Sequence, residues 1–168
     1  MNVNQREPAE ILIIDEDPLA LASATAALDA AGHSVYQAKD RPAALKIARA
    51  EALDLVICDM NVAGDSGLEL SREMRKLPGM QDVPVMFISR TQMPDIVRRS
   101  HEAGAAYYLR KPLDPDVLID LVGKALWLPH LVQTRIAMHE HSTRPMPPPA
   151  RKMTARQAAI QGIRLPLA

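Results

Sequence analysis

The sequence predicts an α/β fold in which a doubly wound, five-stranded parallel sheet carries helices on both faces. Short apolar runs of strand length alternate five times with longer stretches of helical periodicity. A strict alternation of this kind indicates a parallel sheet with right-handed crossovers. The common strand order of such a sheet is 2-1-3-4-5, which places a crevice at the C-terminal ends of the first and third strands.

The five predicted strands are short runs rich in aliphatic residues. They cover Glu10–Ile14, Ser34–Ala38, Leu55–Cys58, Val83–Ile88 and Tyr107–Leu109. Several are apolar almost throughout, which is typical of parallel strands that are buried on both faces. We therefore expect the C-terminal ends of these strands to lie along one edge of the sheet.

Five helices are predicted between and after the strands. They cover Pro18–Ala31, Arg41–Ala52, Gly67–Leu77, Pro94–Ala103 and Pro115–Trp127. Carboxylate caps precede three of them, at Asp17, Asp40 and Asp114. Ser66 and Glu69 fit a capping box at the start of the third helix. Gly32 and Gly104 stand where the first and fourth helices should end.

Length and charge divide the chain into a body and a tail. The chain has 168 residues, enough for one domain and an appendage, and 48% of them are hydrophobic. From Pro129 onward six basic residues face one acid, so residues 1–128 carry a net charge of −5 and the rest carries +5. We expect a flexible N-terminus over 1–8, a domain over 9–128, and a basic, proline-rich tail over 129–168 that could include short helices.

The sequence favours a cytoplasmic protein. Cys58 is the only cysteine, which excludes a disulfide framework and fits a reducing compartment. The N-terminus lacks the apolar core of a signal peptide, and no apolar stretch approaches the length of a membrane span. We therefore expect no membrane partner.

Polar residues follow the predicted strands at their C-terminal ends. Asp15 and Glu16 follow the first strand, Asp59 the third, Ser89 the fourth, and Lys111 the fifth. Taken singly, each has an ordinary interpretation as a strand-end acid, a cap or a loop residue. Together at one edge, the carboxylates suit Mg²⁺, a lysine offsets their charge, and a carboxylate can attack phosphorus. The pattern predicts a site for a divalent cation and a phosphoryl group.

This order of residues resembles the CheY-like receiver domain of the two-component response regulator family. The resemblance covers roughly residues 9–128 and implies a flavodoxin-like fold. It depends on the acid pair, Asp59, Ser89, the Lys111-Pro112 step and the loop Asp59-x-Asn61-x-x-Gly-x-Ser-Gly67. The resemblance also implies a cis peptide bond between Lys111 and Pro112.

The resemblance implies a role for each crevice residue. Asp59 would accept a phosphoryl group from a sensor histidine kinase or a histidine phosphotransfer protein. Ser89 and Lys111 would bind the phosphoryl oxygens. The Mg²⁺ ligands would be Asp15, Glu16, Asp59 and the backbone carbonyl of Asn61. The chain would then be no enzyme in the usual sense, since it would catalyse only its own aspartyl phosphorylation and dephosphorylation.

The resemblance implies output through protein contacts. Ser89 and the aromatic switch residue Tyr108 would relay phosphorylation to the face made by the fourth helix, fifth strand and fifth helix. That face would contact a downstream protein target or form a homodimer. No DNA-binding domain is evident in the residues that follow the predicted domain.

Three positions depart from the family pattern. Glu16 replaces the commoner aspartate, and Val62-Ala63 replaces methionine-proline, which suggests a less rigid loop. Arg90 stands where the family usually has a small residue. We hypothesise that Arg90 modulates phosphoryl-group lifetime or donor access; the alternative is an arginine that points to solvent.

Two other functions fit parts of the sequence. A degenerate receiver would keep the fold and act as a phosphorylation-independent binding module, which Arg90 and Ala63 favour. A haloacid dehalogenase-like phosphatase would use Asp15 as its nucleophile and Asp17 as acid and base. The short chain, the lack of a cap domain and the unassigned Asp59 weigh against the phosphatase.

Overall fold

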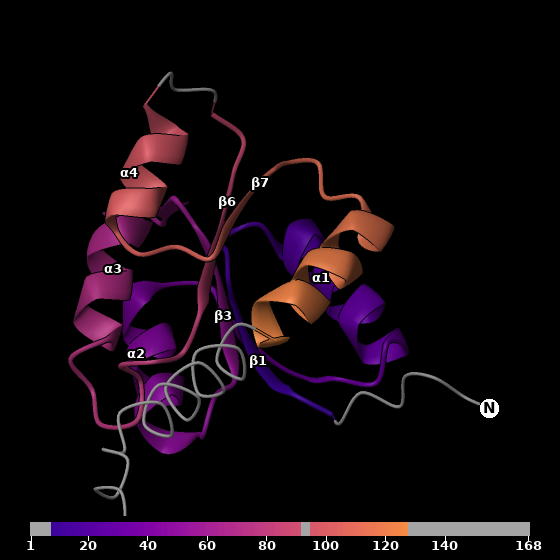
Figure 1. Cartoon of the computed structure of the whole chain (residues 1–168), viewed down its shortest axis with the longest axis horizontal. Helices are drawn as coiled ribbons and strands as arrows, with labels where there is room; N and C mark the ends of the chain where they lie inside the picture. Colours follow the sequence, from indigo (N-terminus) through magenta and orange to yellow (C-terminus); the bar gives the residue numbers. More distant parts are fainter. Residues whose placement is uncertain (1–7, 92–94, 128–168) are drawn as a thin grey trace, which may run out of the picture. The chain divides into compact units, whose positions relative to one another are not determined.

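The computed structural model describes residues 8–91 and 95–127, and its centre is a five-stranded parallel sheet (Figure 1). The strands are β1 (Glu10–Ile14), β2 (Ser34–Ala38), β3 (Leu55–Asp59), β6 (Val85–Ser89) and β7 (Tyr107–Arg110). Their order across the sheet is β2-β1-β3-β6-β7, and every neighbouring pair is parallel. This is the predicted order 2-1-3-4-5, so the predicted fold class is confirmed.

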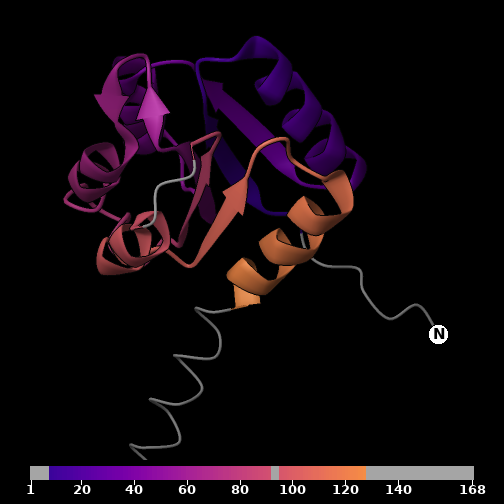
Figure 2. The ribbon, with the colours of Figure 1, turned by 90° about the horizontal axis from the view of Figure 1, so that it is seen from above.

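Helices cover both faces of the sheet (Figures 1 and 2). They are α1 (Pro18–Ala30), α2 (Arg41–Ala50), α3 (Gly67–Met74), α4 (Ile96–Glu102) and a helix over 115–127. Helix α1 and the helix over 115–127 pack on one face, while α2 and α3 pack on the other. The doubly wound arrangement follows, because each parallel crossover returns over one face of the sheet.

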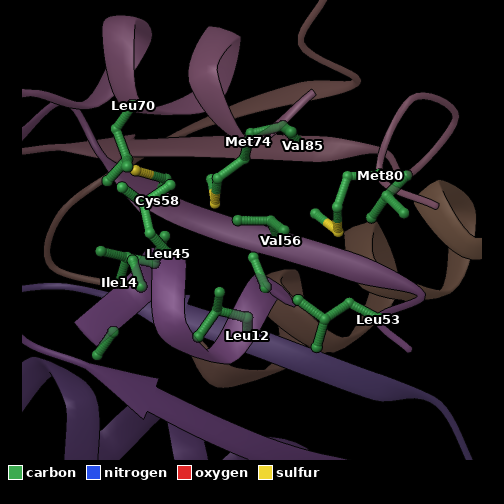
Figure 3. Packing of buried hydrophobic residues seen from close by; sticks show 14 of the residues in the cluster. Leu12, Ile14, Leu45, Leu53, Val56, Cys58, Leu70, Met74, Met80 and Val85 are labelled. Atoms are coloured by element: carbon green, nitrogen blue, oxygen red, sulfur yellow. The ribbon is translucent and has the colours of Figure 1, made fainter. Parts of the chain in front are cut away.

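The strands bury alternate side chains in two separate clusters. Ile11 and Ile13 of β1 lie in the cluster under α1, whereas Leu12 and Ile14 lie in the cluster under α2 and α3. Figure 3 shows part of the second cluster, in which the side chains of β1 and β3 meet those of α2 and α3. Burying an aliphatic side chain of this size stabilises the fold by about 1.5–3 kcal/mol.

The helix boundaries form by the predicted local mechanisms. The Asp17 carboxylate accepts a hydrogen bond from Leu19 N at 2.9 Å, and the Asp40 carboxylate accepts one from Ala43 N at 2.9 Å. Asp114 caps the helix over 115–127 through the backbone N–H groups of the two residues that follow Pro115. Gly32 and Gly104 adopt φ values of 90° and 75°, the left-handed backbone that favours glycine after a helix.

Several boundaries differ from the prediction by one to three residues. Strand β3 includes Asp59, which lies in register with Ile88 of β6. Strand β6 begins at Val85 rather than Val83, since Pro84 has no N–H to contribute to a ladder. Helix α2 ends at Ala50 and α3 at Met74, while the predicted start of α4 at residue 94 lies outside the described residues.

The segment after Asp59 is a tight hairpin, where a turn-rich, less rigid loop was predicted. Strands β4 (Asn61–Val62) and β5 (Asp65–Ser66) pair antiparallel, apart from the main sheet (Figure 2). Ala63 and Gly64 connect them with φ values of 51° and 87°. Positive φ at both central residues is the backbone of a type I′ turn, which matches the twist of a hairpin.

The predicted segments 1–8 and 129–168 lie outside the described residues, apart from Pro8. Within the described part of the chain, no helix is long and apolar enough to cross a membrane.

Candidate functional site

The structure brings the predicted strand-end residues together at one edge of the sheet. They line a pocket of about 190 Å³, whose walls include Asp15, Glu16, Asp59, Asn61, Ser89 and Lys111. The residues at or just after the C-terminal ends of β1, β3, β6 and β7 meet there, as the parallel topology requires. Three further wall residues, Asp17, Arg90 and Thr91, come from the loops that follow β1 and β6.

Lys111 lies between the two buried carboxylates. Its Nζ atom is 2.5 Å from Asp59 Oδ2 and also pairs with Asp15 Oδ2. The side chains of Lys111, Asp15 and Asp59 are only 6%, 1% and 12% exposed. Burial opposes protonation of the lysine, but the hydrogen bonds to Asp15 and Asp59 outweigh it and raise the pKa of Lys111. The Lys111 ammonium therefore stays charged. The peptide bond between Lys111 and Pro112 is cis, as the resemblance implies.

The second oxygen of each carboxylate is held by the backbone of the following loop. Asp15 Oδ1 accepts a hydrogen bond from Asp17 N, and Asp59 Oδ1 accepts one from Asn61 N, both at 3.0 Å. Asp15 Oδ2 is buried, and the ammonium of Lys111 is its ion-pair partner. A carboxylate oxygen that faces an ammonium can also coordinate a metal cation.

Gly67 positions the backbone of Asp59, a role that could not be predicted from the sequence pattern. Gly67 N donates to Met60 O at 2.9 Å. A methyl group on Gly67 would lie 3.0 Å from the Asp59 carbonyl carbon and would overlap its oxygen. The start of α3 therefore packs directly on the end of β3, and only glycine permits this approach.

Both predicted switch residues form hydrogen bonds with the backbone of Thr91. Ser89 is buried, and its Oγ accepts a hydrogen bond from Thr91 N at 3.1 Å. The Tyr108 hydroxyl donates to the Thr91 carbonyl at 3.4 Å. Thr91 therefore connects the two residues through the loop after β6. No feature of the sequence had marked it.

Arg90 reaches across the crevice. Its guanidinium forms an ion pair with the Asp17 carboxylate, although the Arg90 side chain is 67% exposed and that of Asp17 is 24% exposed. The hydrogen bond from Leu19 N, assisted by Ala20 N and the charge of Arg90, holds the pKa of Asp17 below its usual value against a smaller effect of burial. Arg90 is thus largely exposed and also lines the crevice, so the hypothesis that it modulates phosphorylation stays a prediction.

The acids are not arranged as a ready-made metal cage. Glu16 is exposed at the pocket wall, and the residues that the structure describes contain no preassembled metal-binding group of three His, Cys, Asp or Glu side chains. The ammonium of Lys111 lies between the two buried carboxylates and supplies the positive charge there. This agrees with the expectation that the lysine offsets the acids.

Comparison with known proteins places this crevice in a family. The model of the response regulator receiver domain matches residues 11–123. Protein PilH of Pseudomonas aeruginosa is 31% identical over 119 residues, which cover 70% of this chain and 98% of PilH. Sporulation initiation phosphotransferase F of Bacillus subtilis is 29% identical and is covered to 93%. A solved structure of a response regulator from Chloroflexus aurantiacus aligns with a TM-score of 0.67 at 28% identity, over 71% of this chain and 98% of that one.

Other curated relatives are longer proteins. The chain spans between 15% and 27% of the length of three of them. The likeness to these proteins concerns one domain and does not extend to their other activities. The extent of the family match, together with the strand order and the crevice at residues 15, 59, 89 and 111, shows that this chain belongs to the response regulator receiver domain family.

Proposed function

We propose that the domain accepts a phosphoryl group on Asp59 and passes the signal on through protein contacts. The observation that carries the proposal is the geometry at Asp59: one carboxylate oxygen is held by Asn61 N and the other by the ammonium of Lys111. The group is nearly buried yet lines an open pocket. A carboxylate held in one orientation beside a cation can act as a nucleophile toward phosphorus.

The chemistry is phosphoryl transfer. An Asp59 oxygen forms a bond to phosphorus while the bond from phosphorus to the donor's nitrogen or oxygen breaks. The leaving group keeps the electron pair and takes a proton from solvent, and Asp59 becomes an acyl phosphate. Lys111 offsets the charge on the phosphoryl oxygens, and Ser89, buried at the pocket wall, can donate its hydroxyl proton to one of them.

The residues present fit a magnesium ion. Asp15 holds a buried carboxylate oxygen beside Lys111, Glu16 is exposed at the pocket wall, and Asp59 and the Asn61 carbonyl would complete an all-oxygen donor set. Hard oxygen donors of this kind suit Mg²⁺, with waters filling the remaining positions. When bound, the ion would supply positive charge beside the transferred phosphoryl group.

The family relationship supports the choice of partners. A sensor histidine kinase or a histidine phosphotransfer protein would supply the phosphoryl group. Output would go to a protein target, or to a second copy of the chain, through the face of α4, β7 and the helix over 115–127. The bond from Tyr108 in β7 to Thr91 links the crevice to that face. We assign the receiver to residues 9–128 and leave the basic segment 129–168 as a separate tail.

Labelling with a small donor tests the proposal. The protein is incubated with phosphoramidate and Mg²⁺, and the intact mass is followed over time. We expect one phosphoryl group on the wild type and none on Asp59→Asn. Asp65→Asn is the matched control, because it neutralises a half-buried acid in the neighbouring hairpin, and it should label normally. Equal labelling of Asp59→Asn would refute the assignment of Asp59.

The same samples address the alternatives. A wild type that no phosphoryl donor labels would favour the binding module. The family match disfavours the phosphatase that uses Asp15 as its nucleophile. If the protein hydrolysed a phosphomonoester, and this activity were lost in Asp15→Asn but kept in Asp59→Asn, the phosphatase would become the favoured function.

A further inference from the structure

The ion pair between Arg90 and Asp17 stands between two pockets. One is the crevice that contains Asp59, and both members of the pair line it. The other is a pocket of about 390 Å³ beside the start of α1, and both members line that one too. Its remaining walls come from α1 and the loop after β7 and are largely apolar, with Leu19, Ala20, Pro112 and Leu113 among them. Lys111 also lines both pockets, so the pair and Lys111 together stand between the candidate phosphoacceptor and this neighbouring pocket, which we call the α1 groove.

Each member of the pair is linked to a buried residue of the crevice, Asp17 by a hydrogen bond to Asp15 and Arg90 as the residue that follows Ser89. The backbone N–H of Asp17 donates a hydrogen bond to the Asp15 carboxylate. Arg90 lies in sequence between Ser89 and Thr91, and Thr91 N donates a hydrogen bond to Ser89 Oγ. The pair thus joins the loop after β1, which begins with Asp15 and Glu16, to the loop that follows Ser89 at the end of β6. Opening it requires no rearrangement of the core, because both side chains lie at the surface.

The groove is suited to contact with another protein. Leu19 lies at its edge and is 79% exposed, the highest value among the large hydrophobic residues of the described part of the chain. A donor whose phosphohistidine enters the crevice places the rest of its mass against a neighbouring surface, and the α1 groove, which the Arg90–Asp17 pair borders, is one such surface. A small donor needs only the crevice itself.

We propose that the Arg90–Asp17 ion pair is an autoinhibitory latch, which closes the crevice toward the α1 groove and slows phosphorylation by a bulky phosphohistidine donor more than by a small one. This inference rests on the proposed phosphorylation of Asp59. When the latch opens, the two pockets become one groove that leads from Asp59 to Leu19. Exposed ion pairs of this kind shift an equilibrium about two- to fivefold and weaken in salt.

Neutral variants of the two residues give the sharpest test. Asp17→Asn removes the charge but keeps an oxygen that can cap Leu19 N. Arg90→Gln removes the opposite charge, and the double variant removes both. Two probes are used: phosphoramidate, and a histidine-containing helical peptide that has been phosphorylated with phosphoramidate and then purified. Asp65→Asn controls for the loss of one negative charge in the region.

The latch predicts a specific pattern of rates. Each single variant and the double variant should be labelled by the peptide about two- to fivefold faster than the wild type, with no additional gain in the double variant. Labelling by phosphoramidate should change less. Raising the salt concentration should increase the ratio of peptide to phosphoramidate rates in the wild type but not in Asp17→Asn.

Other patterns would overturn it. A change in Arg90→Gln without a change in Asp17→Asn would mean that Arg90 acts on the phosphoryl group directly. Equal effects on both donors, or peptide labelling that no variant accelerates, would show that the pair does not screen the crevice. Failure of phosphoramidate to label even the wild type would instead refute the proposed phosphorylation, so the two failures can be told apart.

Discussion

The contact between Gly67 and the end of β3 gives the most direct test of how the fold positions Asp59. In Gly67→Ala, the added methyl carbon would lie 3.0 Å from the Asp59 carbonyl carbon and 3.1 Å from Met60 Cα. Carbon atoms in contact normally stay about 3.5–4.0 Å apart. The Asp59 carbonyl oxygen lies closer still to the added methyl group. The strand end and the helix start must therefore separate by roughly 1 Å or more, since the overlapping atoms are backbone and cannot rotate away.

The expected loss of stability is moderate. Overpacking of a filled interior costs about 1–3 kcal/mol. Replacing glycine at the first position of α3 returns up to about 1 kcal/mol through helix propensity. We expect Gly67→Ala to lower the free energy of unfolding by about 2 kcal/mol, which leaves the protein folded. The displacement falls on Asp59 itself, so phosphorylation should slow more than the loss of stability explains.

Gly64→Ala supplies a control of similar cost in the same segment. Gly64 has φ of 87° and open space around its Cα, so alanine there is strained by about 1–2 kcal/mol but does not press on Asp59. Urea unfolding gives the two stabilities, and phosphoramidate labelling at a temperature where both variants are folded gives the two rates. A Gly67→Ala stability within 0.5 kcal/mol of wild type would contradict the packing argument. Equal labelling rates for the two variants would contradict the positioning of Asp59 by Gly67.

Two further predictions concern stability. Lys111→Met should cost about 3 kcal/mol at pH 7, because it leaves two buried carboxylates without their cation. The pKa of Lys111 is raised above its ordinary value of 10.5, so this contribution is complete below pH 10.5 and is lost as the pH rises through the higher folded pKa. Urea unfolding of both proteins from pH 7 to pH 12 checks it, and a difference that stays constant to pH 12 would contradict it. Ala63→Gly should stabilise the protein by up to about 1 kcal/mol, because relief of the left-handed alanine exceeds the entropy cost of glycine; a loss of stability on urea unfolding would show that the hairpin is not strained there.

Most strands and helix caps could be predicted from the sequence, because they depend on rules that involve only neighbouring residues. Each strand and cap depends on a few neighbouring residues, such as Asp17 before Pro18 or Asp40 before Arg41. To predict the crevice, we also had to assume that the strands run parallel in the order 2-1-3-4-5. Once that order holds, Asp15 and Asp59 must end adjacent strands, so the meeting of strand-end residues follows from topology without any knowledge of their contacts.

Contacts between loops were beyond such rules. Arg90 and Asp17 are 73 residues apart, and no periodicity relates a loop after β6 to a loop after β1. Thr91 was missed for the same reason, because its two bonds depend on how the loop after β6 folds over Ser89 and Tyr108. The hairpin after Asp59 was missed because Ala63 adopts a backbone that alanine seldom adopts.

Stability alone does not account for the charges buried at the strand ends. An ion pair taken out of water loses hydration that its mutual attraction only partly restores, and apolar replacements are often as stable or more so. The residues just below Asp15 and Asp59 in β1 and β3 are fully buried and apolar, so the core would continue readily to the edge of the sheet. Instead, the edge holds two buried carboxylates and one ammonium. An arrangement that is costly to bury and that lines a pocket is better explained by a ligand that binds there, as the proposed cation and phosphoryl group would.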